Sequence, residues 1–176
     1  QNASVITWIA DPELLQAAAE IANGYEVLRD GELVVGDRSK DARAWITSLK
    51  WAVRQSRLHT LPYADIDASA ARRAGLEQDV VRSITLSPGI AEQVVEQPVE
   101  GGIAWASSGR IDKRTANLLA EAGVTTIVLA ADAMPPVESK SDPRVPTLTP
   151  NGIADYSTAV SVIDALILDS GLTNAI

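Results

Sequence analysis

Short apolar runs alternate with helical segments along this chain, and the alternation limits its possible folds more than any other feature. Three runs, residues 5–11, 58–67 and 103–108, are short enough for strands and end in Asp, Tyr or Ser. A fourth, residues 124–130, is strongly β-branched and leads to Asp132. Amphipathic helical spacing separates the runs. Strand–helix alternation predicts an α/β fold with a mostly parallel sheet.

Polar residues indicate where the helices start and stop. Asp before an apolar periodic segment is typical of an N-cap, Pro suits the first helical position and Gly is typical of a helix end. The same logic predicts further starts at Ser39 and at Ser87-Pro88. The clearest signals are Asp11-Pro12 with Gly24, Asp65 or Asp67 with Gly75, and Asp112 with Gly123.

Two other segments complete the predicted architecture. Residues 25–35 carry Asp30-Gly31 between alternating residues, which predicts a small β-hairpin. Ala159, Val160, Ile163 and Ile167 share a helical spacing, so we expect a last helix after Asp155 or Ser157 that ends at Gly171, whereas residues 134–150 read as a loop. Four or five strands are too few for an eight-stranded barrel. The alternatives are a partial or distorted (β/α) barrel and an open sheet.

Composition limits the possible partners. At 176 residues with 46% apolar content, the chain predicts one α/β domain, residues 1–176, and its abrupt ends suggest a piece of a longer protein. The net charge of −8 disfavours nucleic acid and anionic membranes. No Cys is present, so disulfides and thiolate metal sites are excluded. No membrane-spanning run or leader is visible, so any anchor would lie outside the chain.

The strand ends define one candidate site. If the first three runs are neighbouring parallel strands, their carboxyl ends meet at one face, where ligands bind in such sheets. Two aspartates there would supply the acid and the nucleophile or base of a glycosidase, although N-capping already accounts for Asp11 and one of the other two. The candidate catalytic residues are Asp11, Asp65 and Asp67.

Aromatic and hydroxyl side chains at the same ends are candidates for ligand binding. Trp8 and Trp105 would stack on sugar rings if exposed, but in a chain without Phe we expect at least one of them to fill the core. Tyr63 follows Pro62 in a turn, so we expect it, more than either tryptophan, to reach the solvent-exposed face. The candidate ligand-binding residues are Tyr63, Trp105, Ser107, Trp8 and Asp132.

Other chemistries have little support in the sequence. His59 is the only histidine, which disfavours a zinc site, and it lies early in its strand, away from Ser107, so a Ser107–His59–Asp triad is disfavoured too. Neither glycine-rich nucleotide motif occurs. A Ca²⁺ or Mg²⁺ site at Asp65 and Asp67 would rest on carboxylates alone. We therefore expect no metal and no cofactor.

Three segments together resemble a family of large actinobacterial cell-envelope proteins of unknown function. They are Thr-Trp-Ile-Ala-Asp-Pro-Glu-Leu-Leu (7–15), Leu-Pro-Tyr-Ala-Asp-Ile-Asp (61–67) and Ala-Gly-Val-Thr-Thr-Ile-Val-Leu (122–129). The Ala-rich, Lys-poor composition also fits, and the resemblance extends from residue 5 to about residue 150. It implies a secreted, membrane-anchored protein, often encoded beside the lipid II flippase, with a domain similar to the glycoside hydrolase/deacetylase β/α-barrel superfamily.

The sequence departs from active members of that superfamily. It lacks the His-x-x-x-His metal pair of the deacetylases, and no Glu stands at a strand end as a nucleophile. The first hypothesis is therefore an extracytoplasmic, non-catalytic or degenerate domain that binds a glycan precursor or a partner, such as the flippase, in cell-wall biogenesis. The alternatives are a carbohydrate hydrolase using paired aspartates and a cytosolic α/β ligand-binding domain.

Overall fold

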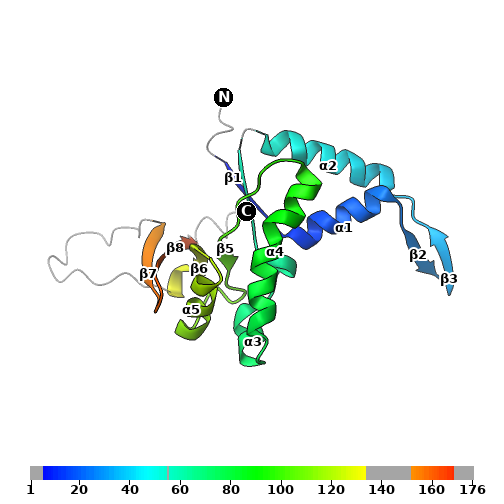
Figure 1. Ribbon diagram of the computed structural model, residues 1–176. Coiled ribbons are helices and arrows are strands. Elements are labelled where there is room, and N and C mark those ends of the chain that lie inside the picture. The colour runs from blue at the N-terminus through cyan, green and yellow to red at the C-terminus, as the bar shows by residue number, and fades with distance from the viewer. Residues whose placement is uncertain (1–5, 55, 134–151, 169–176) are drawn as a thin grey trace. The chain divides into compact units, whose positions relative to one another are not determined.

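The computed structural model describes residues 6–54, 56–133 and 152–168 (Figure 1). It divides into two compact units. The first takes its residues from Gln1–Asp65 and Ser83–Gly101, and the second from Ile66–Arg82 and Gly102–Ile176. The predicted loop at residues 134–150 and the predicted stop at Gly171 lie outside the described residues. The predicted α/β class is confirmed, with small, mostly parallel sheets, and the described strands form no closed barrel.

The first unit contains one pair of short parallel strands, and two helices and a hairpin lie between these strands in the sequence. Its elements are β1 (Thr7–Ala10), α1 (Pro12–Asn23), β2 (Glu26–Arg29), β3 (Glu32–Val35), α2 (Ser39–Val53), β4 (Arg57–Thr60), the 3₁₀ turn η2 (Tyr63–Asp65) and the later part of α4 (Glu77–Val95). β1 pairs in parallel with β4, from Thr7 opposite Arg57 to Ala10 opposite Thr60. The prediction that the first two runs are parallel neighbours is confirmed.

Aliphatic side chains from both strands and three helices form the core of this unit. Its buried members are Leu15, Val53, Leu58, Ala91, Val94, Val95 and Val99. Ala10, Ala19, Ile46 and Leu49 pack against them. Burying an aliphatic side chain of this size contributes about 1.5–3 kcal/mol, so this cluster fixes α1, α2 and α4 around β4.

The hairpin predicted near residues 25–35 is confirmed. β2 and β3 are antiparallel, and the turn residues Asp30 and Gly31 have φ values of 53° and 88°, as a two-residue turn requires. The hairpin follows α1 and precedes α2 (Figure 1). One of its faces carries the exposed aliphatic side chains of Leu28, Leu33 and Val35.

The second unit is built on a four-stranded sheet. Its elements are α3 (Ala68–Arg73), the start of α4, β5 (Ile103–Trp105), α5 (Lys113–Glu121), β6 (Thr126–Ala130), the 3₁₀ turn η3 (Ala131–Ala133), β7 (Ile153–Ser157) and β8 (Val162–Leu168). The strand order is β5-β6-β8-β7, with β5, β6 and β8 parallel and β7 antiparallel. β1 and β4 form one sheet and β5 belongs to another, so the expectation that the first three apolar runs are neighbouring strands is wrong for the third.

The predicted last helix is wrong. Residues expected to be helical instead form β7, a turn and β8, in which Thr158 Oγ1 accepts the amides of Val160 and Ser161. Ile163 and Ile167 are four residues apart, which suits a helix face, but that spacing also places them on one side of a strand. Both are buried together with Ala165, which lies between them. Burial of this face, together with the pairing of β8 with β6 and β7, explains why the segment is a strand and not a helix.

The predicted helix start at Ser39 is confirmed, although Ser39 does not cap the helix, whereas the predicted start at Ser87-Pro88 is wrong. α2 begins at Ser39, but its N-cap residue is Arg38 and no side chain caps it. Ser87-Pro88 lies inside the continuous helix α4 rather than at a new start. Pro88 has no amide to donate, and Ser87 Oγ donates to the Ser83 carbonyl, at 2.5 Å. That hydroxyl is buried within the helix and caps nothing.

We predict that replacing Gly109 by Ala destabilises the fold by about 2–4 kcal/mol. Gly109 has a φ of +68°, and a Cβ there would lie 2.5 Å from the Ala130 Cβ and 3.2 Å from its amide nitrogen. Urea unfolding measures the change in the free energy of unfolding. Gly75→Ala is the matched control because φ there is +76° with nothing within 4 Å, so it should cost only about 1 kcal/mol. Equal losses would contradict close packing at Gly109.

Candidate functional site

Asp11 joins the end of β1 to the turn that follows β4. Its Oδ1 accepts the Glu13 amide at 2.9 Å, which caps α1, and the Ala64 amide at 3.1 Å. The N-cap predicted for Asp11 is confirmed. Because one oxygen accepts two backbone amides, this carboxylate has a structural role: it joins the start of α1 to the turn after β4.

Asp65 lies in the turn that Asp11 holds. The turn is tight, since Ala64 and Asp65 have φ values of 60° and 41°, a region that residues other than glycine rarely adopt. Partial burial of a mostly exposed carboxylate, followed by the negative charge of Asp11, raises the pKa of Asp65 above its ordinary value. The structure therefore brings Asp11 and Asp65 together, as parallel strand ends predict. Asp65 does not cap α3, because Asp67 takes that position.

The expectation that Tyr63 is more exposed than the two tryptophans is wrong, because its side chain contacts α1. Its hydroxyl donates to Gln16 Oε1 at 3.0 Å and its side chain is partly buried. Trp8, on β1, has 37% of its surface exposed, and Trp105, at the end of β5, has 42%. The expectation that at least one of these two tryptophans fills the core is wrong. Both cores close instead with Leu, Ile, Val and Ala side chains.

The second unit contains a pocket of about 370 Å³ beside the carboxyl end of β5. Its lining comes from the segment that follows β5, from both ends of α3 and from the N-cap of α5. The residues that line it are Asp67, Ser69, Arg73, Ser107, Ser108, Arg110, Ile111 and Asp112. Hereafter we call it the β5 pocket. Two predicted site residues, Asp67 and Ser107, therefore line the same pocket.

The two aspartates of the β5 pocket are helix caps. Asp67 Oδ1 accepts the Ala70 amide at 2.9 Å and caps α3. Asp112 Oδ1 accepts the Thr115 amide at 2.9 Å and caps α5. The Thr115 amide, the Thr115 hydroxyl and Arg72 all bond to Asp112 and hold its pKa below the usual range.

Arginine and serine side chains supply the remaining polar groups of the pocket. Arg110 Nη2 lies 2.6 Å from Asp132 Oδ2, which connects the predicted residue Asp132 to the pocket rim. The side chains of Arg73 and Ser107 have no hydrogen-bond partner among the residues that the structure describes. A guanidinium, hydroxyls and carboxylate oxygens offer both donors and acceptors to a ligand.

Sequence reasoning missed Arg73, Arg110 and Ser69. Ser107-Ser108-Gly109-Arg110, which directly follows a strand, is the signal that could have found the arginine of that loop. Arg73 and Ser69 lie on α3, and only the tertiary packing of α3 near α5 brings them to this pocket. Asp11, Tyr63, Asp65 and Trp8 belong to the first unit and Asp67, Trp105, Ser107 and Asp132 to the second.

Other predicted chemistries find no new support. His59 Nε2 lies 3.7 Å from Glu100 Oε2, within the first unit, and Ser107 belongs to the second. Within residues 6–54, 56–133 and 152–168, no group of three or more His, Cys, Asp or Glu side chains could hold a metal ion. Among the helices in these ranges, none has the length and apolar content to cross a membrane.

Comparison with known proteins leaves the chain without an assigned family. No protein-family model matches it, and no curated protein matches it.

We predict that Asp65→Asn stabilises the protein at pH 7, by no more than about 1 kcal/mol because the side chain is exposed. A raised pKa means that ionised Asp65 is disfavoured in the fold. Wild-type stability is therefore fullest below the pKa of the unfolded chain and falls as pH rises through the folded pKa. Asn cannot ionise and keeps that stability.

The measurement is urea unfolding at several pH values from acid to neutral. The gap between variant and wild type should widen with pH. Glu26→Gln, which removes a carboxylate from the exposed hairpin, is the control measured alongside it. A gap that is constant or narrows with rising pH would rule out a raised pKa at Asp65.

Proposed function

We propose that this chain is a non-catalytic binding domain of an extracytoplasmic, membrane-anchored cell-envelope protein, and that the β5 pocket binds a glycan precursor in cell-wall biogenesis. The resemblance of residues 7–15, 61–67 and 122–129 to envelope proteins motivates the location. It also motivates the finer fold proposal, a partial or distorted barrel of the glycoside hydrolase/deacetylase type. The site itself is argued from the pocket.

The composition of the β5 pocket carries the proposal. Saccharides present many hydroxyls, each able to donate and to accept, so their sites combine both kinds of group. The pocket offers Arg73 as donor, Asp67 Oδ2 as acceptor, and three serine hydroxyls. Its volume of about 370 Å³ lies within the usual range for small-molecule sites, about 300–1,000 Å³. It also lies beside a strand carboxyl end, where ligands of parallel sheets bind.

The roles of the aspartates favour binding over catalysis. A glycosidase needs two carboxyl groups free to exchange protons or attack a sugar carbon. Asp11 and Asp67 accept backbone amides at helix N-termini. Moving either carboxylate would uncap a helix, at a cost of about 0.5–2 kcal/mol.

One observation favours a second candidate, a carbohydrate hydrolase that uses Asp11 and Asp65. The general acid of such enzymes is a carboxyl with a raised pKa beside a second carboxyl, and the pKa of Asp65 is raised beside Asp11. Incubation with wall glycans would test it. Hydrolysis by wild type that is lost in Asp65→Asn would establish an enzyme, and no hydrolysis leaves the binding proposal in place.

For the binding proposal, we predict that immobilised wall glycans and soluble muropeptides retain the protein, and that Arg73→Gln weakens binding about tenfold. Loss of a charged hydrogen bond costs about 1.5–3 kcal/mol, and 1.4 kcal/mol is tenfold. Ser107→Ala should weaken binding less. Titration calorimetry measures each affinity.

Arg82→Gln is the matched control, because Arg82 is an exposed arginine of the same unit that does not line the pocket. Equal losses in Arg73→Gln and Arg82→Gln would indicate nonspecific charge attraction and overturn the site. If no glycan binds, the partner becomes an envelope membrane protein, such as the lipid II flippase implied by the resemblance.

A further inference from the structure

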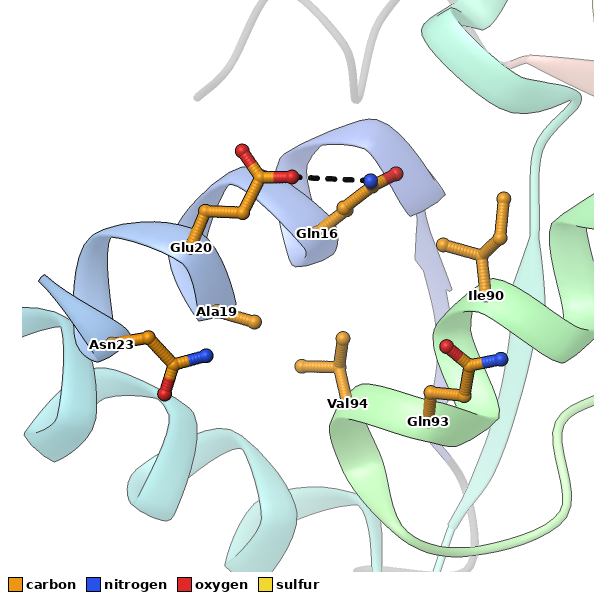
Figure 2. Close-up of a pocket in the computed structure, with 7 residues that line it drawn as sticks. All are labelled: Gln16, Ala19, Glu20, Asn23, Ile90, Gln93 and Val94. Carbon is orange, nitrogen blue, oxygen red and sulfur yellow. Dashed lines mark hydrogen bonds between the residues drawn. The ribbon is translucent and has the colours of Figure 1, made fainter. Parts of the chain in front are cut away.

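A second concave site lies in the first unit, between α1 and the later part of α4 (Figure 2). This α1–α4 groove has a volume of about 340 Å³. Its lining combines three carboxamides, one carboxylate and three aliphatic side chains. The residues are Gln16, Asn23 and Gln93, then Glu20, then Ala19, Ile90 and Val94.

A hydrogen-bonded series fixes the carboxylate of the groove. The Tyr63 hydroxyl donates to Gln16 Oε1 at 3.0 Å, and Gln16 Nε2 donates to Glu20 Oε1 at 3.1 Å. Figure 2 shows Glu20 and Gln16 joined in this way along α1. Gln16 is therefore a positioning residue, which holds one oxygen of Glu20 and leaves the other, Oε2, without a bond to any described residue.

The other two carboxamides are available to a ligand. Within the described ranges, neither the Asn23 nor the Gln93 side chain has a hydrogen-bond partner. A carboxamide offers a donor and an acceptor side by side, which matches the amide group of a peptide. Ala19 and Val94 face each other across the groove and provide an apolar floor (Figure 2).

The lining of the groove also indicates which ligands it disfavours. None of its residues is aromatic, so it has no surface on which a sugar ring would stack. None is basic, so Glu20 is the only charged group and favours a cation over an anion. These features distinguish the α1–α4 groove from the β5 pocket, which has two arginines.

We propose that the α1–α4 groove binds a short peptide segment that carries a free amino group. The amine would pair with Glu20, the peptide amides would bond to Asn23 and Gln93, and small aliphatic side chains would lie on Ala19 and Val94. This site is independent of the glycan proposal, since it uses different residues and a different ligand chemistry.

The test is an NMR titration of the ¹⁵N-labelled full chain with three probes. They are acetyl-Ala-Lys-Ala-amide, the same peptide with its lysine Nε acetylated, and the disaccharide N,N′-diacetylchitobiose. We expect the lysine peptide to shift amides of residues 16–23 and 90–94 saturably, and acetylation to weaken binding at least tenfold.

Glu20→Gln should weaken binding of the lysine peptide to the level of the acetylated one, whereas Glu13→Gln, on the same helix outside the groove, should not. Gln93→Ala should weaken both peptides equally. Equal binding of the two peptides by wild type, or no saturable shift in these residues, would overturn the proposal. So would disaccharide shifts there without peptide shifts. Shifts near Ser107 report the glycan proposal separately.

Discussion

One carboxylate oxygen, Asp11 Oδ1, connects the chain's first strand, first helix and most distinctive turn. It accepts the amide of Glu13 in α1 and the amide of Ala64 after β4, which lies 53 residues further along the chain. β1 and β4 are parallel, so their carboxyl ends lie at the same edge and Asp11 can reach the neighbouring turn. The left-handed residues Ala64 and Asp65 are held there against their backbone preference. Tyr63, in the same turn, then reaches Gln16 and the α1–α4 groove.

The second unit uses aspartate in the same way at two helix starts. Asp67 and Asp112 cap α3 and α5, and both line the β5 pocket. Arg72 of α3 donates hydrogen bonds to Thr115 and Asp112 at the start of α5, and these bonds connect the two helices. A cap sits at the start of a helix that follows a strand, which is also where parallel sheets bind ligands. The fold therefore places acidic side chains at binding positions for structural reasons alone, and their presence there is weak evidence for catalysis.

Local signals account for what could be predicted from the sequence. The Asp11-Pro12 start, the Asp30-Gly31 hairpin and the parallel pairing of the first two runs each depend on residues close together in the chain or on strand–helix alternation. The prediction of a last helix failed because the spacing of Ile163 and Ile167 fits both a helix and a strand. Only the pairing of this segment with β6 and β7 decides between the two. The sequence predicted only part of the β5 pocket. Ser107 and Asp67 were candidates because of their places in the sequence, whereas Arg73 lines the pocket because of how α3 packs.

The tryptophans connect the core to the sites. In a chain without Phe, large aromatic side chains were expected to fill space, yet Trp8, Trp45, Trp51 and Trp105 all remain exposed. The fully buried hydrophobic residues among those described are Leu, Ile, Val and Ala, so none of the four tryptophans is a member of these cores. Trp105 ends β5, directly before the loop of the β5 pocket, and Trp8 lies on β1, three residues before Asp11. Exposed aromatic surface beside strand ends is costly to leave in water and is the surface on which sugar rings stack. The tryptophans therefore favour a binding role for the strand ends, whereas the use of the aspartates as helix caps argues against a catalytic role.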